Sequence, residues 1–280
     1  MSNPFKPPAT VLDELGITEP TDIDIEAIAH HCGATILTEP LEGCAARIIG
    51  AGDKALITID EHSRPERQRF SAAHELGHWM RDRGKTAFSC TADQFVDEWS
   101  DDNPERRANR YGADLLMPSV MFKPRAHGRP GTFEAARDLA QTFGTSLTAA
   151  AIKFVSLGTV PTMLVLTTRA GRKWFFPSPL VPEQLWPTTS PGSGSVATKI
   201  LAGTCAARPG PETVDADDWI DHHEAHRYCV VEDSIGMASG RVLTLLWWKD
   251  EDQLLAFDDD DDDPVAGADV PTFGRRRRRG

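Results

Sequence analysis

Apolar and polar positions alternate with two different periods in the first part of the chain. Residues 22–32 (DIDIEAIAHHC) carry apolar side chains at helical spacing, and Gly33 follows as a natural stop. Three short apolar runs come next, and a Gly-Ala-Gly-Asp turn signal separates the last two of them. The pattern therefore predicts one helix followed by strands at residues 34–37, 45–49 and 55–59.

Residues 62–81 predict one long helix. Ser63 and Glu66 have the spacing of a capping box, and Pro65 is tolerated in a first helical turn. An apolar stripe at helical spacing follows, so one face of this helix can be buried: Phe70, Ala73, Gly77 and Met80.

Residues 103–117 predict a second long helix. Asn103 fits the cap position and Pro104 the first helical position, while Pro118 closes the segment. The apolar stripe of this helix consists of Ala108, Tyr111, Gly112 and Leu115.

The later pattern is more mixed. Residues 132–143 and 146–157 predict two further helices joined at Gly144-Thr145. The stretch 177–194 is rich in Pro, Gly, Ser and Thr, which predicts a long loop or linker. Strands are expected at residues 163–167, 173–176, 228–231 and 241–248, the first two paired across residues 169–172.

Composition narrows the classes of function. Thirty Lys and Arg against 42 Asp and Glu give a formal net charge of -12, so general attraction to nucleic acid or to anionic lipid is not expected. No apolar run is long enough to cross a bilayer, and the first twenty residues lack the pattern of a signal peptide. We therefore expect a cytoplasmic protein without a membrane partner.

The cysteines indicate neither a disulfide framework nor a cysteine zinc site. They are five in number, widely spaced and without a CxxC pair, so most are expected to be buried thiols. They are Cys32, Cys44, Cys90, Cys205 and Cys229.

The sharpest chemical signal is HELGH, an HExxH motif inside the helix predicted at residues 62–81. His74 and His78, four residues apart, lie on one helical face, so both imidazoles can reach one metal ion. Glu75 between them can then act on a water molecule at that ion. The alternative is a structural helix whose histidines bond to backbone carbonyls.

A catalytic zinc site usually has three protein ligands, so a third is needed. Glu105 lies on the same stripe as Ala108 and Gly112, where burying a carboxylate without a cation would be costly. The residues alone also allow an exposed Glu105 favoured by the helix dipole. Competing acids are Asp93, Asp97 and Glu98, in a less regular segment.

Two segments together resemble the ImmA/IrrE family of metallopeptidases. They are RFSAAHELGHWM (69–80) and ERRANRYGADLLMP (105–118), which match the family's HExxH and ExxANxFAxxLLMP motifs. The resemblance implies one Zn2+ held by His74, His78 and Glu105, with Glu75 as the catalytic base. Tyr111 and Gly112 depart from the usual Phe and Ala.

The resemblance also implies a fold and a domain organisation. We expect an α+β chain: a zincin-like metallopeptidase domain with a helical extension over residues 1–158, then a smaller mixed α/β domain over 159–257 that senses or selects partners. The tail 258–280, with an Asp run and an Arg run, is expected to be disordered.

The implied activity is zinc-dependent endoproteolysis of a protein substrate. In the family, the targets are DNA-binding repressors of the helix-turn-helix class, so that cleavage switches gene expression. If residues 55–59 form an edge strand beside the cleft, an extended substrate could pair with it. Tyr111 and His127 are weak candidates for a second oxyanion donor. The alternatives are a non-catalytic zinc-fold regulator and the toxin component of a toxin-antitoxin pair.

Two weaker signals remain. Residues 133–157 have the rhythm of a helix-turn-helix, but Lys153 is the lone cation of the second helix, which favours packing over direct DNA binding. His222, His226 and Cys229 have a spacing that could form a second metal site, although a polar loop is the preferred interpretation.

Overall fold

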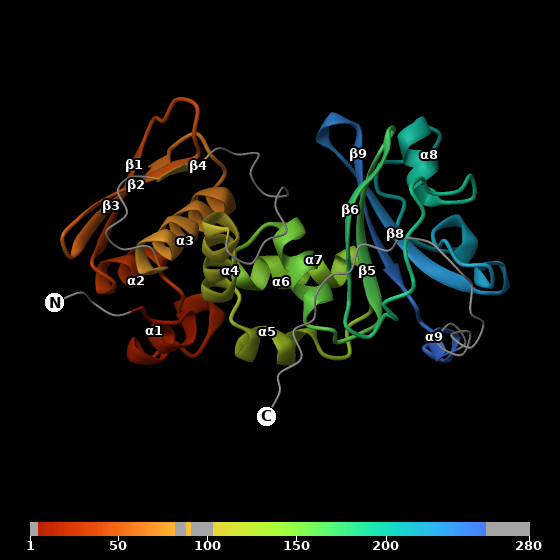
Figure 1. The fold of residues 1–280 in the computed structure, drawn as a ribbon, viewed down its shortest axis with the longest axis horizontal. Helices are drawn as coiled ribbons and strands as arrows, with labels where there is room; N and C mark the ends of the chain where they lie inside the picture. The colour runs from red at the N-terminus through yellow and green to blue at the C-terminus, as the bar shows by residue number, and fades with distance from the viewer. Residues whose placement is uncertain (1–4, 82–87, 91–102, 256–280) are drawn as a thin grey trace, which may run out of the picture.

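The computed structural model describes residues 5–81, 88–90 and 103–255. The predicted tail at 258–280 and the competing acids Asp93, Asp97 and Glu98 lie outside these residues. Figure 1 shows an elongated molecule with one sheet near each end and helices between them. Within the described residues, no helix is long and apolar enough to cross a membrane.

The first sheet has the strand order β1-β3-β2-β4. β1 is parallel to β3, whereas β2 is antiparallel to both β3 and β4. The strands are β1 (Ala34–Glu39), β2 (Ala46–Ala51), β3 (Lys54–Asp60) and β4 (Phe88–Cys90). The predicted strands are confirmed, but β3 is central rather than at an edge, so the proposed pairing of substrate with residues 55–59 is wrong.

Helices pack beside this sheet and continue away from it (Figure 1). Gly144, in the left-handed region at φ 60°, ends one helix, and Ser146 caps the next. The helices are α1 (Pro8–Glu14), α2 (Ile25–His31), α3 (Pro65–Arg81), α4 (Pro104–Leu116), α5 (Ser119–Ala126), α6 (Phe133–Phe143) and α7 (Leu147–Ser156), with a 3-10 turn η1 at Pro20–Asp22.

The start of α3 differs from the prediction. The helix begins at Pro65, so Ser63 lies before the cap position, and its hydroxyl donates instead to Asp60 (3.1 Å). The capping box of Ser63 and Glu66 is therefore wrong, although the helix itself is confirmed.

The second sheet is antiparallel throughout, in the order β6-β5-β9-β8-β7. The predicted hairpin across residues 169–172 is confirmed, and β8 is longer than expected. The elements are β5 (Thr162–Thr168), β6 (Gly171–Pro177), α8 (Val196–Ala202), β7 (Pro211–Asp215), β8 (Cys229–Met237), β9 (Arg241–Trp247) and α9 (Asp252–Leu255), with 3-10 turns η2 (Ala216–Asp218), η3 (Ala225–Arg227) and η4 (Ala238–Gly240).

The stretch 177–194 is a loop, as predicted, but it is not a linker. Val181 and Leu185 are 5% and 2% exposed and belong to the core of the second sheet. This loop therefore stabilises the second half of the chain instead of separating two units.

The two halves meet at α6 and α7, which lie between the sheets (Figure 1). Phe143 and Phe154 face the core of the first half, whereas Phe133 and Val155 pack on β5, β8 and β9. At the same contact, Asp233 of β8 accepts a hydrogen bond from the Phe133 N–H (2.7 Å), and burial raises the pKa of that carboxyl. The predicted helix-turn-helix segment thus has both faces occupied by packing.

Lys153, the lone cation of α7, supports the same conclusion. It is 9% exposed, and its ammonium pairs with Asp114 of α4 at 2.8 Å. A helix whose cation already neutralises a carboxylate offers little to a phosphate backbone.

The expectation that most cysteines are buried is wrong for the described side chains. Cys32 is buried, Cys44 and Cys205 are half-buried, and Cys229 is exposed. The side chain of Cys90 lies outside the described residues.

Candidate metal centre

The HExxH motif lies in the most buried part of α3. Ala73 and Leu76 pack into the core on one side of the helix. His74, Glu75 and His78 are 7%, 0% and 1% exposed. Burial of three such polar groups on adjacent turns is costly unless they hydrogen-bond to one another or bind a ligand.

Close packing of α3 against α4 brings the third donor into place. A Cβ on Gly77 would lie 2.9 Å from the Ala108 carbonyl oxygen, and one on Gly112 would lie 3.1 Å from the His74 nitrogen. The two glycines therefore let the backbones approach more closely than larger residues would allow. The departure of Gly112 from the family pattern fits this contact.

Three donor side chains converge where the helices cross. The two Nε2 atoms of His74 and His78 are 3.1 Å apart. One oxygen of Glu105 lies 3.2 Å from the His74 Nε2, and the other lies 3.2 Å from the His78 Nε2. Among the described residues, these three form the one group of His, Cys, Asp or Glu that could hold a metal ion.

The donor separations suit zinc. Ligand atoms bound tetrahedrally at about 2.0–2.2 Å lie about 3.3–3.6 Å from one another. The separations of 3.1 and 3.2 Å are close to that edge length. Two imidazole nitrogens with one carboxylate are also a donor set that zinc prefers in catalytic sites.

Asn109 fixes the protonation of the first histidine. Its side-chain oxygen lies 2.8 Å from His74 Nδ1, so that ring nitrogen must carry the proton that it donates. In the neutral ring, Nε2 then presents a lone pair toward the Glu105 carboxylate. A metal ion at this point would bind both atoms, and without one a proton on Nε2 bridges them.

The environment of Glu105 agrees with this interpretation. Hydrogen bonds to His74 and then to His78 hold the pKa of this carboxyl far below its usual value, against the opposing effect of burial. Its side chain is 24% exposed, and its N–H is bonded to the Asn103 cap (2.8 Å). Glu105 therefore faces both histidines and is not a free exposed first-turn residue.

Glu75 lies between His74 and His78 on α3. It precedes His78 by three residues, which places both side chains on neighbouring positions of one helical face. Its carboxylate is fully buried, one residue from His74, where it could exchange a proton with a water molecule.

Other predicted candidates lie elsewhere. The Tyr111 hydroxyl donates to the Lys6 carbonyl (3.3 Å), and His127 is exposed just after α5. His226 Nδ1 bonds to the His223 carbonyl (2.8 Å) in a turn around η3. His222, His226 and Cys229 do not converge as a metal-binding group within the part of the chain that the structure describes.

Comparisons with known proteins agree with this architecture. A Mycobacterium tuberculosis transcriptional regulator of known structure superposes with a TM-score of 0.57, covering 91% of this chain and 79% of its own, at 15% identity. At that identity the likeness shows a shared fold, and it extends over both halves of the molecule. No curated protein sequence matches the chain.

The family comparison bears on the site itself. Residues 29–154 match the IrrE N-terminal-like domain, Peptidase_M78. This match spans α3, α4 and all three converging donors. Residues 29–154 therefore form a domain of the ImmA/IrrE (Peptidase_M78) type, as the two motifs predicted.

Proposed function

We propose that this protein is a zinc-dependent endopeptidase that cleaves a protein substrate, with His74, His78 and Glu105 as the metal ligands. The observation that carries the proposal is the convergence of two Nε2 atoms and one carboxylate within 3.2 Å of one another, beside a buried Glu75. The membership of residues 29–154 in a peptidase family supports the same chemistry.

The protein's own residues account for the proton transfers. Zinc held by the three donors would polarise the scissile carbonyl and lower the pKa of a water molecule. Glu75 accepts the proton of the attacking water and passes it to the leaving amine. Asn109 keeps the proton of His74 on Nδ1, so that Nε2 stays available as a ligand.

The proposed target is a DNA-binding repressor of the helix-turn-helix class, whose cleavage switches gene expression. The family resemblance suggests this target, and the structural neighbour is itself described as a transcriptional regulator. The net charge of -12 favours association with a basic protein over binding to DNA.

The test compares wild type with Glu75→Gln. Each is mixed with zinc and the helix-turn-helix regulator encoded beside its gene, and the products are analysed by mass spectrometry. Wild type should give one discrete cut. Glu75→Gln should retain zinc but cut at least about 1000-fold more slowly, because the ligands remain and the base does not.

Glu61→Gln is the matched control, since Glu61 is exposed and lies before α3. It should cleave like wild type. Equal cleavage by Glu75→Gln would refute the role of Glu75. Zinc binding without any cleavage by wild type would instead favour the non-catalytic regulator.

A further inference from the structure

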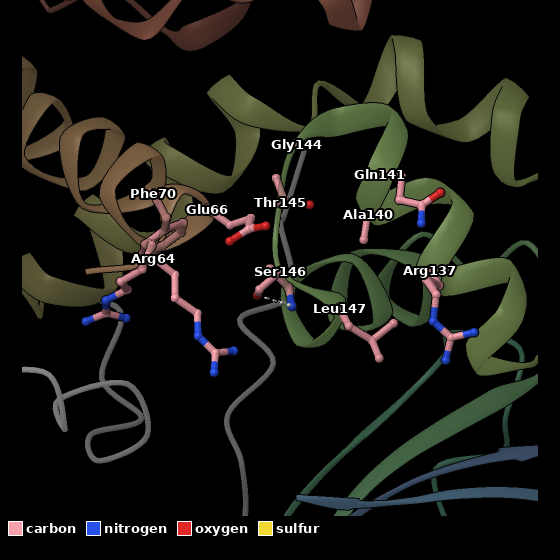
Figure 2. A pocket seen from close by; sticks show the side chains of 12 residues that line it. Arg64, Glu66, Phe70, Arg137, Ala140, Gln141, Gly144, Thr145, Ser146 and Leu147 are labelled. Carbon is pink, nitrogen blue, oxygen red and sulfur yellow. Dashed lines mark hydrogen bonds between the residues drawn. The ribbon is translucent and has the colours of Figure 1, made fainter. Parts of the chain in front are cut away.

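A groove of about 550 Å3 lies beside the catalytic helix, between the beginning of α3 and the turn that joins α6 to α7. Arg64 and Arg67 come from the α3 side, and Arg137 comes from α6. Figure 2 shows Arg64 and Arg137 on opposite sides of the groove, with Ser146 and Leu147 between them. The groove is thus bordered by basic side chains on both sides.

One lining residue of the groove lies next to the proposed metal centre. Phe70 lines it, and the Phe70 ring centroid is 6.3 Å from that of His74, one helical turn further along α3. Arg64 and Arg67 precede His74 by ten and seven residues, which corresponds to about 15 and 10 Å along a helix. An extended peptide covers these distances with about three to five residues.

The sign of the charge in this groove opposes that of the molecule. Three arginines and one acid, Glu66, line the groove, whereas the whole chain carries -12. Within the described part of the chain, the guanidinium groups of Arg64 and Arg137 form neither a hydrogen bond nor an ion pair. Arg137 does lie near enough to Asp233 to favour the ionised form of that carboxyl.

Three nearby cations, unlike Arg64 and Arg137, form ion pairs within the protein. Arg125 pairs with Glu19 at 2.5 Å, Arg129 with Asp138 at 3.0 Å, and Lys153 with Asp114 at 2.8 Å. Arg125, Arg129 and Lys153 are therefore neutralised by the protein itself. Arg64 and Arg137 remain available for carboxylates from outside, and a guanidinium binds a carboxylate through two parallel hydrogen bonds.

We infer that this groove is a specificity subsite that binds an acidic segment of the protein substrate, about three to five residues from the scissile bond. The inference rests on the proposed peptidase function and adds a substrate preference to it. An acidic peptide fits better than nucleic acid, because nucleic acid requires an extended positive track and the surrounding protein is acidic. A short run of carboxylates needs a positively charged surface no longer than this groove.

The binding test uses the full-length, zinc-loaded Glu75→Gln protein, which should hold a peptide without cutting it. The probe is a fluorescein-labelled ten-residue peptide with four Glu in a Gly/Ser background. The comparison probes are the same peptide with four Gln and a ten-nucleotide oligo-dT. We expect the Glu peptide to bind at least about tenfold more tightly than either one, and its affinity to fall with added salt.

Arg64→Glu/Arg137→Glu, made in the same background, should weaken binding of the Glu peptide at least tenfold. It should also bind a matched four-Lys peptide more tightly than the parent protein does. Lys54→Glu/Lys249→Glu carries the same change in charge at exposed positions outside the groove and should bind like the parent. Zinc content and Tm of each variant show whether the fold is retained.

Several results would overturn the inference: equal affinity for the Glu and Gln peptides, tighter binding of oligo-dT, or no effect of the arginine reversals. Any of them can occur while wild type still cleaves the helix-turn-helix regulator, in which case the proposed function stands without this subsite. Conversely, if the peptide binds selectively but wild type does not cleave the regulator, the groove is a peptide-binding site and the proposed peptidase function is wrong.

Discussion

Each half of the molecule holds a glutamate among polar groups, and the two sites differ in what surrounds the carboxylate. Glu232 of β8 is 0% exposed and accepts four hydrogen bonds of 2.7–2.9 Å. The donors are the N–H groups of Val196 and Ala197 at the start of α8, the indole of Trp219 and the hydroxyl of Ser234. Both of its oxygens therefore accept hydrogen bonds from donors of the protein itself.

The carboxylate of Glu105 has different partners. Its oxygens face the Nε2 atoms of two histidines, and Asn109 holds the proton of His74 on the far side of the ring. Glu232 thus fixes a helix to a sheet, whereas Glu105 completes a group of side chains that could hold a metal ion. The difference shows that burial of a carboxylate does not by itself indicate chemistry; the partners of its oxygens do.

The largest expected effect is a loss of zinc from Glu105→Ala with little change in stability. Glu105→Ala should reduce bound zinc from about one ion per chain to less than about a tenth, because one of three ligands is lost. The free energy of unfolding of the metal-free protein should change by less than about 1 kcal/mol, since the Glu105 side chain is 24% exposed. Metal analysis and urea unfolding in EDTA measure the two quantities.

Unchanged zinc content in Glu105→Ala would exclude Glu105 as a ligand. The matched control is Glu134→Ala, which removes an exposed carboxylate from the first turn of α6. That variant should keep its zinc, because Glu134 is not part of the converging donor group.

Much of the centre could be predicted from spacing alone. His74, Glu75 and His78 lie within five residues of one helix, so the helical period already places them together. Glu105 was ambiguous from its own stripe, because the crossing of α3 and α4 decides whether it faces the histidines. The family motif favoured the ligand role, and the structure brings the three side chains together.

Features set by distant contacts were missed. Asn109 lies one helical turn after Glu105, a spacing that could have indicated a shared face, but its partner His74 is 35 residues away. Strand order is likewise not contained in a strand's own pattern, so the sequence left an edge position open for β3, which is central. The helix α5 was missed because Pro124 lies inside it and Pro118 precedes it.

The second half offers the next largest effect. Glu232→Ala should lower the free energy of unfolding by about 3 kcal/mol, because four buried donors lose a charged acceptor. Glu232→Gln should also destabilise, since its amide NH2 would face donors at one of the two oxygen positions. Urea unfolding measures both changes, and zinc content should stay that of wild type.

If Glu232→Gln lost zinc but kept its stability, the purely structural role of Glu232 would be wrong. A suitable comparison is Glu212→Gln on β7, whose side chain is exposed. Substitution there should alter the unfolding free energy by no more than about 0.5 kcal/mol.

The smallest of the three effects concerns Asn109, which contacts the proposed ligand His74 and is not itself in the donor group. Asn109→Ala should weaken zinc affinity about 10- to 100-fold while leaving one site per chain, because the His74 ring loses the acceptor that fixes its proton. Asn109→Asp keeps an oxygen acceptor and should recover most of that affinity. Competition with a chromophoric zinc chelator measures both variants. If Asn109→Ala bound zinc as tightly as wild type, the orientation of His74 would have to come from packing around α3 alone.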